Sequence, residues 1–526
     1  MRNKWRWVVV PILLLLMLFA AAATFLQADL LAAPDVLLIL GTWVAIAIVI
    51  AVAKIDKRFV RSHQPTTWIG RRFGRGPRGI ALTASILLTI VCAIAVYLLG
   101  QRVSVVTSEI SRFDLRIVDL AHAQETINQR PVMSALTEIG RGRITTVMLV
   151  LIALGAMVAG ARRAVLLMVA IPALSSIAVT TLKAFHSRPR PAFGSLLEAS
   201  HSFPSGHSAG GLALATGVLV MARRCGFKRT WLASGILLPL GLSIGYSRAY
   251  LSVHWTSDVV GGWLVAAATT GLVLAISLAL PRTAEKWEVK HGWIDAGLGA
   301  AMVLALIVGL AGARNSFPDF PATIPEQVAG LEGVLKQLPP TSETLLGRQV
   351  EPVNLLVTSA EGDLQSTLRD LGYTRAIHLT PLRIINPDRS EDLKELSVSR
   401  AFLDTRVQDF AMQMPSQNGL SRHYARFWRL PVSLQNGCVV WAINATLRDS
   451  SGRLEWQLIP ESHIRPKVDE EREFLTMKLV DSGLFRFSEL RRVRNTQSDR
   501  SAGGDLFVTD GKIALLEALA PCETKR

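Results

Sequence analysis

Long apolar runs fill the first three-fifths of the chain and constrain its fold more than any other feature. A helix needs roughly 20 apolar residues to cross the hydrocarbon layer of a membrane. Runs of about this length occupy 5–25, 36–53, 80–99, 145–160, 164–183, 208–222, 231–246, 259–280 and 293–313. We therefore expect about nine membrane-spanning helices. The first run is longer than the apolar part of a usual signal peptide, which favours a retained helix over a cleaved signal.

Basic residues between the apolar runs indicate which side of the membrane each loop occupies. The chain has a formal net charge of +16, and the loop 54–78 carries eight Lys and Arg residues against the single acidic Asp56. Short basic loops stay on the cytoplasmic side. Counting spans from this loop puts the later basic loops inside as well, and the segments 183–207 and 247–258 outside. The distribution favours membrane orientation over nucleic-acid binding as the reason for the charge.

Two motifs on the outer side carry groups that can bind phosphate. Lys183 ends one apolar run and Arg190 follows in the loop, so that a point charge and a planar fork are both available to phosphate oxygens. Ser205, Gly206 and His207 precede another run. Ser is a good N-cap, free N–H groups at a helix start bind anions, and His transfers protons near neutral pH. Interfacial anchoring and a simple helix cap are the plain alternatives for each motif taken alone.

A third motif on the same side contains Arg248, His254 and Asp258. The last two are four residues apart and would share one face of a helix. The carboxylate can then hold a proton on one imidazole nitrogen and leave the other nitrogen free to attack. A surface His–Asp pair is the alternative, but ionisable groups near a membrane are costly and usually functional. Together the motifs supply what phosphoryl transfer requires, although this reasoning leaves open which histidine attacks.

The order and spacing of the motifs resemble those of the type 2 phosphatidic acid phosphatase family, which is itself similar to vanadium haloperoxidases. The resemblance covers about residues 80–282. It implies that His254 is the nucleophile, that Asp258 orients it, and that His207 is the general acid and base. It further implies that Lys183, Arg190, Ser205, Gly206 and Arg248 bind the substrate phosphate, with no metal and no cofactor.

The family's fold implies an all-α membrane domain with a six-helix phosphatase core and about three extra transmembrane helices. We expect a two-helix segment with its basic loop at 1–79, the catalytic domain at 80–282, another transmembrane helix at 283–316, and a soluble mixed α/β domain at 317–526. The polar loop 101–143 contains spaced apolar residues, which predict an amphipathic helix at the interface near the site.

The expected soluble domain resembles the LssY-type C-terminal domain found on such phosphatases. The resemblance rests on residues 352–357, 423–428, Trp441 and 469–472. Strands are expected at 353–357 and 439–445, and helices at 364–371 and 470–479. Cys438 and Cys522 would form a disulfide in an oxidising compartment, with two separate thiols as the alternative. His423, His463 and Asp469 are candidates for a metal site, although such isolated polar positions are more often structural.

These observations predict a multi-pass phosphatase of the inner membrane, with its site and C-terminal domain on the periplasmic face. The expected partner is a lipid-linked phosphate, with undecaprenyl diphosphate first. Phosphatidic acid, phosphatidylglycerol phosphate and lipid A are alternatives, as is phosphate transfer to another acceptor. A non-catalytic lipid transporter or scaffold is the alternative of a different class. The C-terminal domain is expected to bind an envelope polymer or partner rather than to be a second enzyme.

Overall fold

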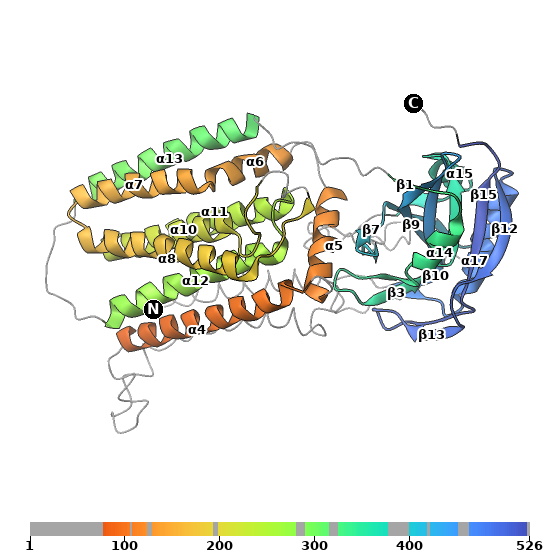
Figure 1. The fold of residues 1–526 in the computed structure, drawn as a ribbon, viewed down its shortest axis with the longest axis horizontal. Coiled ribbons are helices and arrows are strands. Elements are labelled where there is room, and N and C mark those ends of the chain that lie inside the picture. The colour runs from red at the N-terminus through yellow and green to blue at the C-terminus, as the bar shows by residue number, and fades with distance from the viewer. Residues whose placement is uncertain are drawn as a thin grey trace, which may run out of the picture. The chain divides into compact units, whose positions relative to one another are not determined.

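The computed structural model describes residues 77–105, 108–123, 129–192, 198–279, 290–314, 325–376, 399–417, 421–450 and 462–522. The chain divides near residue 320 into two compact units, which Figure 1 shows as a helical part and a sheet-rich part. The helices expected at 5–25 and 36–53, and nearly all of the loop 54–78, lie outside the described residues.

Long helices form the core of the first unit. In chain order they are α4 (Pro77–Val103), α7 (Gly142–Val158), α8 (Arg162–His186), α10 (Gly206–Arg224), α11 (Thr230–Tyr250) and α12 (Thr256–Ala279), followed by α13 (His291–Arg314). Of these, α4, α8, α11, α12 and α13 are long and apolar enough to cross a membrane. Helix α7 qualifies together with α6 (Gln129–Ile139), to which it is joined at a bend of 58°. The chain is a multi-pass membrane protein with an all-helical membrane domain.

Helix α10 is an expected span that is less apolar than the others and does not qualify by composition. It packs against α8, α11 and α12, so much of its surface meets protein rather than lipid. Small residues let these helices approach closely. At Gly217, for example, an added Cβ would lie 2.8 Å from the carbonyl oxygen of Met168. Enclosure by its neighbours therefore explains why this helix, which begins at the motif that contains Ser205 and His207, needs less apolar surface.

The outer surface of the bundle is apolar. Leu166, Ile236 and Met302, on three different helices, are 69%, 69% and 71% exposed. Large exposed apolar surface is unfavourable in water and marks contact with another apolar phase. These side chains therefore suit contact with lipid.

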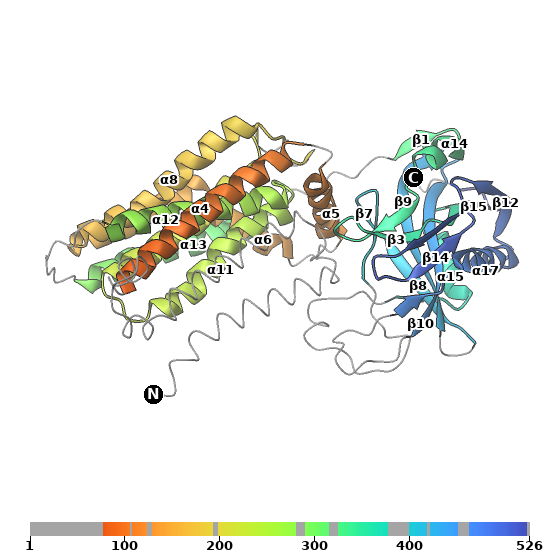
Figure 2. The ribbon, with the colours of Figure 1, turned by 90° about the horizontal axis from the view of Figure 1, so that it is seen from below.

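The described residues of the loop 101–143 form two short helices, so the expectation of one amphipathic helix was wrong in number. They are α5 (Glu109–Ala123) and α6, separated by residues that the structure does not describe. Figures 1 and 2 both place α5 across one end of the helical bundle. Polar side chains of α5 are buried against the rest of the protein. The helix therefore makes tertiary contacts, which a helix that only lies in the membrane interface need not make.

The described residues of the second unit form three sheets, as expected for a mixed α/β domain. Its largest sheet has the order β12–β15–β4–β10–β9–β8–β5, with β1 paired to β9 and β11 to β10. The strands of this sheet are β1 (Glu326–Val328), β4 (Leu355–Ser359), β5 (Thr374–Arg375), β8 (Phe410–Pro415), β9 (Ser421–Leu434), β10 (Val439–Ser450), β11 (Ser462–Ile464), β12 (Phe485–Arg492) and β15 (Lys512–Ala518). Strands β2 (Thr341–Glu343), β3 (Gln349–Pro352), β6 (Phe402–Leu403) and β7 (Arg406–Val407) form a second sheet, and β13 (Gln497–Arg500) pairs with β14 (Leu506–Thr509).

Helices cover both faces of the central strand β4, which is buried throughout. Leu355 and Val357 pack in one core with α15 (Asp363–Asp370) and α17 (Val468–Asp481), while Leu356 packs in another core with α14 (Leu331–Gln337). The alternation follows from the two-residue period of a strand. The expected strands and helices are confirmed, and Cys438 and Cys522 form the disulfide.

Candidate active site

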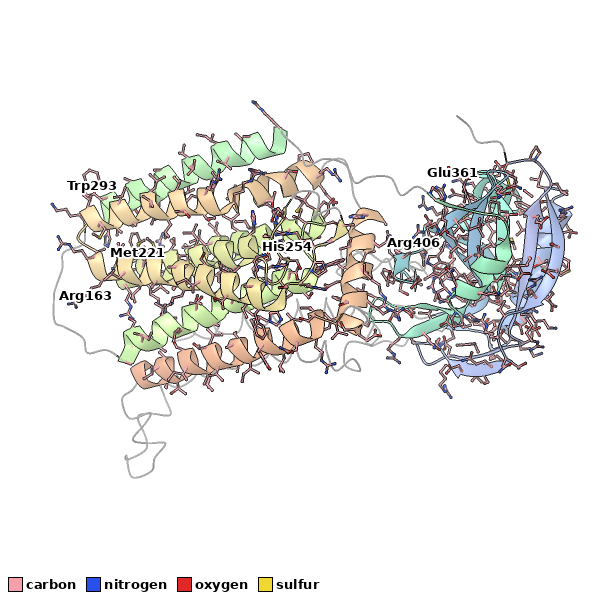
Figure 3. The ribbon with its side chains drawn as sticks, viewed as in Figure 1. Arg163, Met221, His254, Trp293, Glu361 and Arg406 are labelled. Carbon is pink, nitrogen blue, oxygen red and sulfur yellow. A yellow bond between two sulfur atoms is a disulfide. The ribbon has the colours of Figure 1, made fainter. Side chains whose placement is uncertain are left out.

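The three motifs meet at one end of the helical bundle. Lys183 lies in the last turn of α8, Ser205 to His207 lie at the start of α10, and Arg248 lies in the last turn of α11. His254 precedes α12, which carries Asp258 in its first turn. Figure 3 shows His254 toward this end and Arg163 at the opposite end of the helices. The structure thus gathers residues that span more than seventy positions of the sequence.

His254 and Asp258 form the expected pair. His254 Nδ1 lies 3.3 Å from Asp258 Oδ2, and both side chains are almost fully buried. The backbone N–H of Trp255 donates to the same Oδ2 at 3.0 Å, which fixes the carboxylate. Burial, followed by the charges of Arg248 and Arg190, holds the pKa of His254 well below its ordinary value. The imidazole is therefore neutral at pH 7, with its Nδ1 proton toward Asp258.

Arg190 faces the other nitrogen of that imidazole. Its Nη1 lies 2.9 Å from His254 Nε2 and also donates to the carbonyl oxygen of Val253 at 2.9 Å. Its Nε and Nη2 donate to the backbone oxygen and the hydroxyl of Ser200 at 2.7 and 2.9 Å. Because arginine nitrogens are only donors, His254 Nε2 must be the acceptor and carry the lone pair. This tautomer is the one that nucleophilic attack by Nε2 requires.

Glu198 bridges Arg190 and Arg248, a contact that the motifs did not predict. One carboxylate oxygen lies 2.6 Å from Arg190 Nη2, and the other pairs with Arg248 Nη2. Burial raises the pKa of Glu198, but Arg248 and Arg190 outweigh this effect and leave the pKa below its ordinary value. An ionised carboxylate therefore sits between two of the cations that were expected to bind phosphate. The available signal was a single acidic residue within the otherwise basic segment 183–207.

Arg248 retains a donor for an anion. Its side chain is 2% exposed, and Nη1 donates to Thr137 Oγ1 at 2.9 Å. Within the described part of the chain, no group accepts a hydrogen bond from its buried Nε. An unsatisfied buried donor is costly, and a substrate oxygen would remove that cost.

Lys183, Ser205 and Gly206 shape the segment that precedes α10. Lys183 Nζ donates to the backbone oxygens of His201 and Ser202. The Ser205 hydroxyl caps α10 by accepting from the N–H of Ser208 at 3.4 Å, which confirms the expected N-cap. A Cβ added to Gly206 would meet only Val179, at 3.8 Å, so its small size leaves open space at the helix start.

His207 lies beside a cavity of about 320 Å³. Residues of α7, α8 and α10 line this space, among them Thr145, Pro172 and Val179. The charged side chains of Arg248 and Arg190 and the imidazole of His254 are among the neighbours of His207. The second histidine is thus placed between the group of cations and a space that opens among membrane-spanning helices.

Arg188 and Asp114 also belong to this region, although sequence reasoning did not select them. Arg188 Nη1 donates to Asp258 Oδ1 at 2.7 Å, and its Nη2 donates to Asp114 Oδ2 at 2.9 Å. Arg188 stands within the first motif, between Lys183 and Arg190, and its charge was the available signal. Nothing local marks Asp114 as part of a site.

The candidate metal residues of the second unit do not come together. His423 pairs with Glu471 at 2.9 Å, His463 pairs with Asp505 at 2.7 Å, and Asp469 pairs with Arg472 at 3.0 Å. Among the residues described in the two units, no three His, Cys, Asp or Glu side chains are grouped so as to hold a metal ion.

Comparison with known proteins gives a family match on each unit. Residues 163–282 match the PAP2 superfamily, and residues 335–513 match the family described as LssY C-terminus. Phosphatidylglycerophosphatase B of Bacillus subtilis (strain 168) is 30% identical over 139 residues, which are 25% of this chain and 67% of that relative. The crystal structure of the first transmembrane PAP2 type phosphatidylglycerolphosphate phosphatase from Bacillus subtilis aligns at 24% identity and a TM-score of 0.35, over 37% of this chain and 98% of that chain. The family matches agree with the two resemblances inferred from the motifs.

Proposed function

The chain belongs to the PAP2 superfamily and is a membrane lipid phosphatase, and from this premise we propose that it works through a phosphohistidine at His254. The observation that carries the proposal is the state of this imidazole. Burial holds the pKa of His254 well below its ordinary value, Nδ1 lies 3.3 Å from Asp258 Oδ2, and Nε2 faces the Arg190 donor at 2.9 Å. A nucleophile needs this combination of an unprotonated nitrogen and a neighbour that stabilises the charge it acquires.

In the first step, His254 Nε2 attacks phosphorus while the bond between phosphorus and the leaving oxygen breaks. His207 gives a proton to that oxygen, and the lipid alcohol or lipid monophosphate departs. Asp258 stabilises the positive charge that the imidazole acquires. Lys183, Arg190 and Arg248 stabilise charge on the equatorial oxygens, together with Ser205 and the Gly206 N–H at the start of α10. A substrate phosphate would replace Glu198 between the two arginines.

In the second step, water attacks the phosphohistidine. His207, now without its proton, takes one from the water as the bond between phosphorus and Nε2 breaks. Inorganic phosphate leaves, and both histidines return to their first state. The same intermediate would pass phosphate to an alcohol if an acceptor other than water reached it, which is how phosphotransfer remains an alternative.

We propose undecaprenyl diphosphate as the substrate. A bundle with an apolar outer surface and a cavity beside His207 suits a phosphate attached to a long apolar chain. Phosphatidylglycerol phosphate is the first alternative, supported by the name of the Bacillus subtilis relative. Phosphatidic acid and lipid A are further alternatives that present the same phosphate chemistry.

We further propose that the site and the second unit face the periplasm across the inner membrane. The basic residues Arg162, Arg163, Arg223 and Arg224 lie at the helix ends remote from His254, which supports a cytoplasmic position for them. The disulfide between Cys438 and Cys522 supports an oxidising compartment for the second unit. In this arrangement residues 1–79 and 283–316 add spans around the catalytic domain 80–282, and the domain 317–526 binds an envelope polymer or partner.

Phosphate release by the purified full-length protein in detergent, with EDTA present, tests the proposal. Undecaprenyl diphosphate, phosphatidylglycerol phosphate and phosphatidic acid are compared for the wild type and for His254→Ala. We expect release that survives chelation and is abolished in the variant. A substrate labelled in the transferred phosphate should also leave acid-labile, base-stable label on the protein after rapid quenching, and His254→Ala should remove it. Lipid binding without turnover would favour the transporter or scaffold, and an active His254→Ala would refute the assigned nucleophile.

A further inference from the structure

Asp114, in α5, is a buried carboxylate that lies outside the three motifs. Its Oδ1 accepts from the backbone N–H of Ser257 at 2.9 Å, and its Oδ2 pairs with Arg188 Nη2 and with the Ser257 hydroxyl. Ser257 is the second residue of α12, and the first N–H groups of a helix have no partner within it. Asp114 therefore caps the helix that carries Asp258, from 143 residues away in the sequence.

Arg188 connects this cap to the carboxylate that orients the nucleophile. Its Nη1 donates to Asp258 Oδ1 at 2.7 Å and to the Ser257 hydroxyl at 2.8 Å, while its Nη2 reaches Asp114. The guanidinium also lies 5.4 Å from the ring centre of Trp255. Both carboxylates are 0% exposed and Arg188 is 5% exposed, so water screens these ion pairs little.

The two carboxylate oxygens of Asp258 have different hydrogen-bond partners. Oδ1 takes the hydrogen bond from Arg188, and Oδ2 faces His254 Nδ1 and the N–H of Trp255. A rotation of the carboxylate would disturb both sets of contacts at once. Arg188 thereby determines which oxygen faces the imidazole, and Asp114 determines where Arg188 lies.

Helix α5 has a second contact with the same segment. His122 Nε2 lies 2.6 Å from the Ser252 hydroxyl, and Ser252 has a left-handed backbone with a φ of 52°. His254 lies between Ser252 and Ser257, the two residues that α5 contacts. The helix therefore holds the nucleophile's segment on both sides.

We propose that Asp114 and Arg188 are positioning residues for the nucleophile, which makes α5 part of the active site. This inference rests on the proposed role of His254. Attack on phosphorus leaves positive charge on the imidazole, and two carboxylates with one guanidinium carry a net charge of minus one beside it. Asp114 supplies the second of those negative charges, and it keeps Arg188 from being drawn toward Asp258 alone.

The substitution Asp114→Asn in the full-length protein tests the inference. Asparagine has nearly the same shape and can still accept from Ser257, but its amide cannot hold Arg188 by charge. We expect kcat to fall by up to about 100-fold, the loss that a displacement of about 1 Å can cause in a catalytic group. The inhibition constant for inorganic phosphate should stay within about threefold of the wild-type value, since Arg190 and Arg248 are untouched.

A double-mutant cycle with Arg188→Gln provides the second measurement. If Asp114 acts through Arg188, the losses in kcat must be strongly non-additive. Glu109→Gln, at an exposed position of the same helix, is the matched control and should behave as the wild type. An unchanged kcat in Asp114→Asn, additive losses in the cycle, or joint loss of kcat and phosphate inhibition would each overturn the positioning role. A His254→Ala variant that keeps full activity would instead refute the proposed function itself.

Discussion

Arg190 Nη1 lies 2.9 Å from His254 Nε2, so a guanidinium donates to the atom that we propose attacks phosphorus. The contact holds the imidazole in the tautomer that attack requires, but it also occupies the attacking lone pair. A phosphate oxygen bound between the two groups would take over the donor and release that lone pair. Arg190 would then serve first to prepare the nucleophile and afterwards to stabilise the charge on the phosphate.

The first prediction distinguishes what the planar shape of the Arg190 guanidinium contributes to catalysis from what its charge contributes. Arg190→Lys keeps a cation but loses the planar fork, so kcat/KM should fall by about 10²–10³-fold, as when one transition-state donor is removed. Arg190→Gln should also shift the pH profile. The Arg190 charge lowers the pKa of His254, and protonation of His254 stops attack, so loss of that charge moves the acid limb to higher pH. The kcat/KM profile between pH 4 and 8 measures both effects.

The two variants differ in charge, because lysine retains the positive charge of Arg190 and glutamine does not. Its acid limb should stay near that of the wild type, well below pH 6.5, while its overall rate is low. Equal shifts in the two variants would contradict the electrostatic account of His254.

The second prediction concerns Glu198, which pairs with Arg190 and Arg248 and which we therefore expect to compete with the substrate for them. Glu198→Gln removes the negative charge and should tighten inhibition by inorganic phosphate on the order of tenfold, about the worth of one charge-assisted hydrogen bond. Glu198 also raises the pKa of His254, so the acid limb should move to lower pH in this variant. Weaker phosphate inhibition in Glu198→Gln would show that the carboxylate supports anion binding rather than opposing it.

Most of the site could be predicted from the sequence because its motifs are local. Ser205 before an apolar run predicts a cap, and the spacing of His254 and Asp258 predicts one helix face; both contacts are present. The contacts of Glu198 with Arg248 and of Asp114 with Ser257 could not be found in this way, because they join residues 50 and 143 positions apart that no periodic pattern connects. Such contacts depend on how helices pack, which residue types alone do not determine.

The same limit applies to the fold. Runs of apolar residues predicted the helices that face lipid, and strand-like segments predicted β4 and β10. Helix α10 is enclosed by other helices and is therefore less apolar than the helices that face lipid. Close contact with protein favours small residues over large apolar ones. The division of the loop 101–143 into α5 and α6 likewise reflects tertiary contacts, such as that of His122 with Ser252.

The third prediction concerns a buried ion cluster in the second unit. Glu351 is fully buried and pairs with Arg426 at 2.6 Å and with Arg448, while Asn444 donates to it at 2.9 Å. Glu351→Gln would leave two buried guanidiniums without their shared carboxylate, and we expect a loss of about 3–5 kcal/mol in unfolding free energy. Hydrogen exchange of peptides from β9 and β10 measures this locally.

The matched control is Glu361→Gln, which breaks the pair with Arg429. The Glu361 side chain is 70% exposed, so its loss should cost less than about 1 kcal/mol. Similar exchange rates for the two variants would contradict the importance of the buried cluster.

The fourth prediction concerns the disulfide of Cys438 with Cys522, which closes a segment of 84 residues. Replacing both cysteines by serine should destabilise the second unit by about 2–4 kcal/mol. Exchange in β10 next to Cys438 should rise, and peptide mapping of wild-type protein from membranes should recover the linked pair without reduction. Recovery of both as free thiols would contradict the oxidising location proposed for this unit.

The last prediction concerns the contact between α12 and the segment before α10. The Ser205 N–H donates to the Asp258 carbonyl at 2.9 Å, and a Cβ added to Gly262 would lie 2.5 Å from the Ser205 carbonyl oxygen. Gly262→Ala must therefore push α12 away from the segment before α10. A separation of about 1 Å between His254 and the bound phosphate would lower kcat by roughly 100-fold. Gly299→Ala is the control, because a Cβ there meets nothing within 4 Å and alanine favours the helix. Phosphate release by both variants measures the effect, and equal activity would show that α12 and this segment need not be in close contact for catalysis.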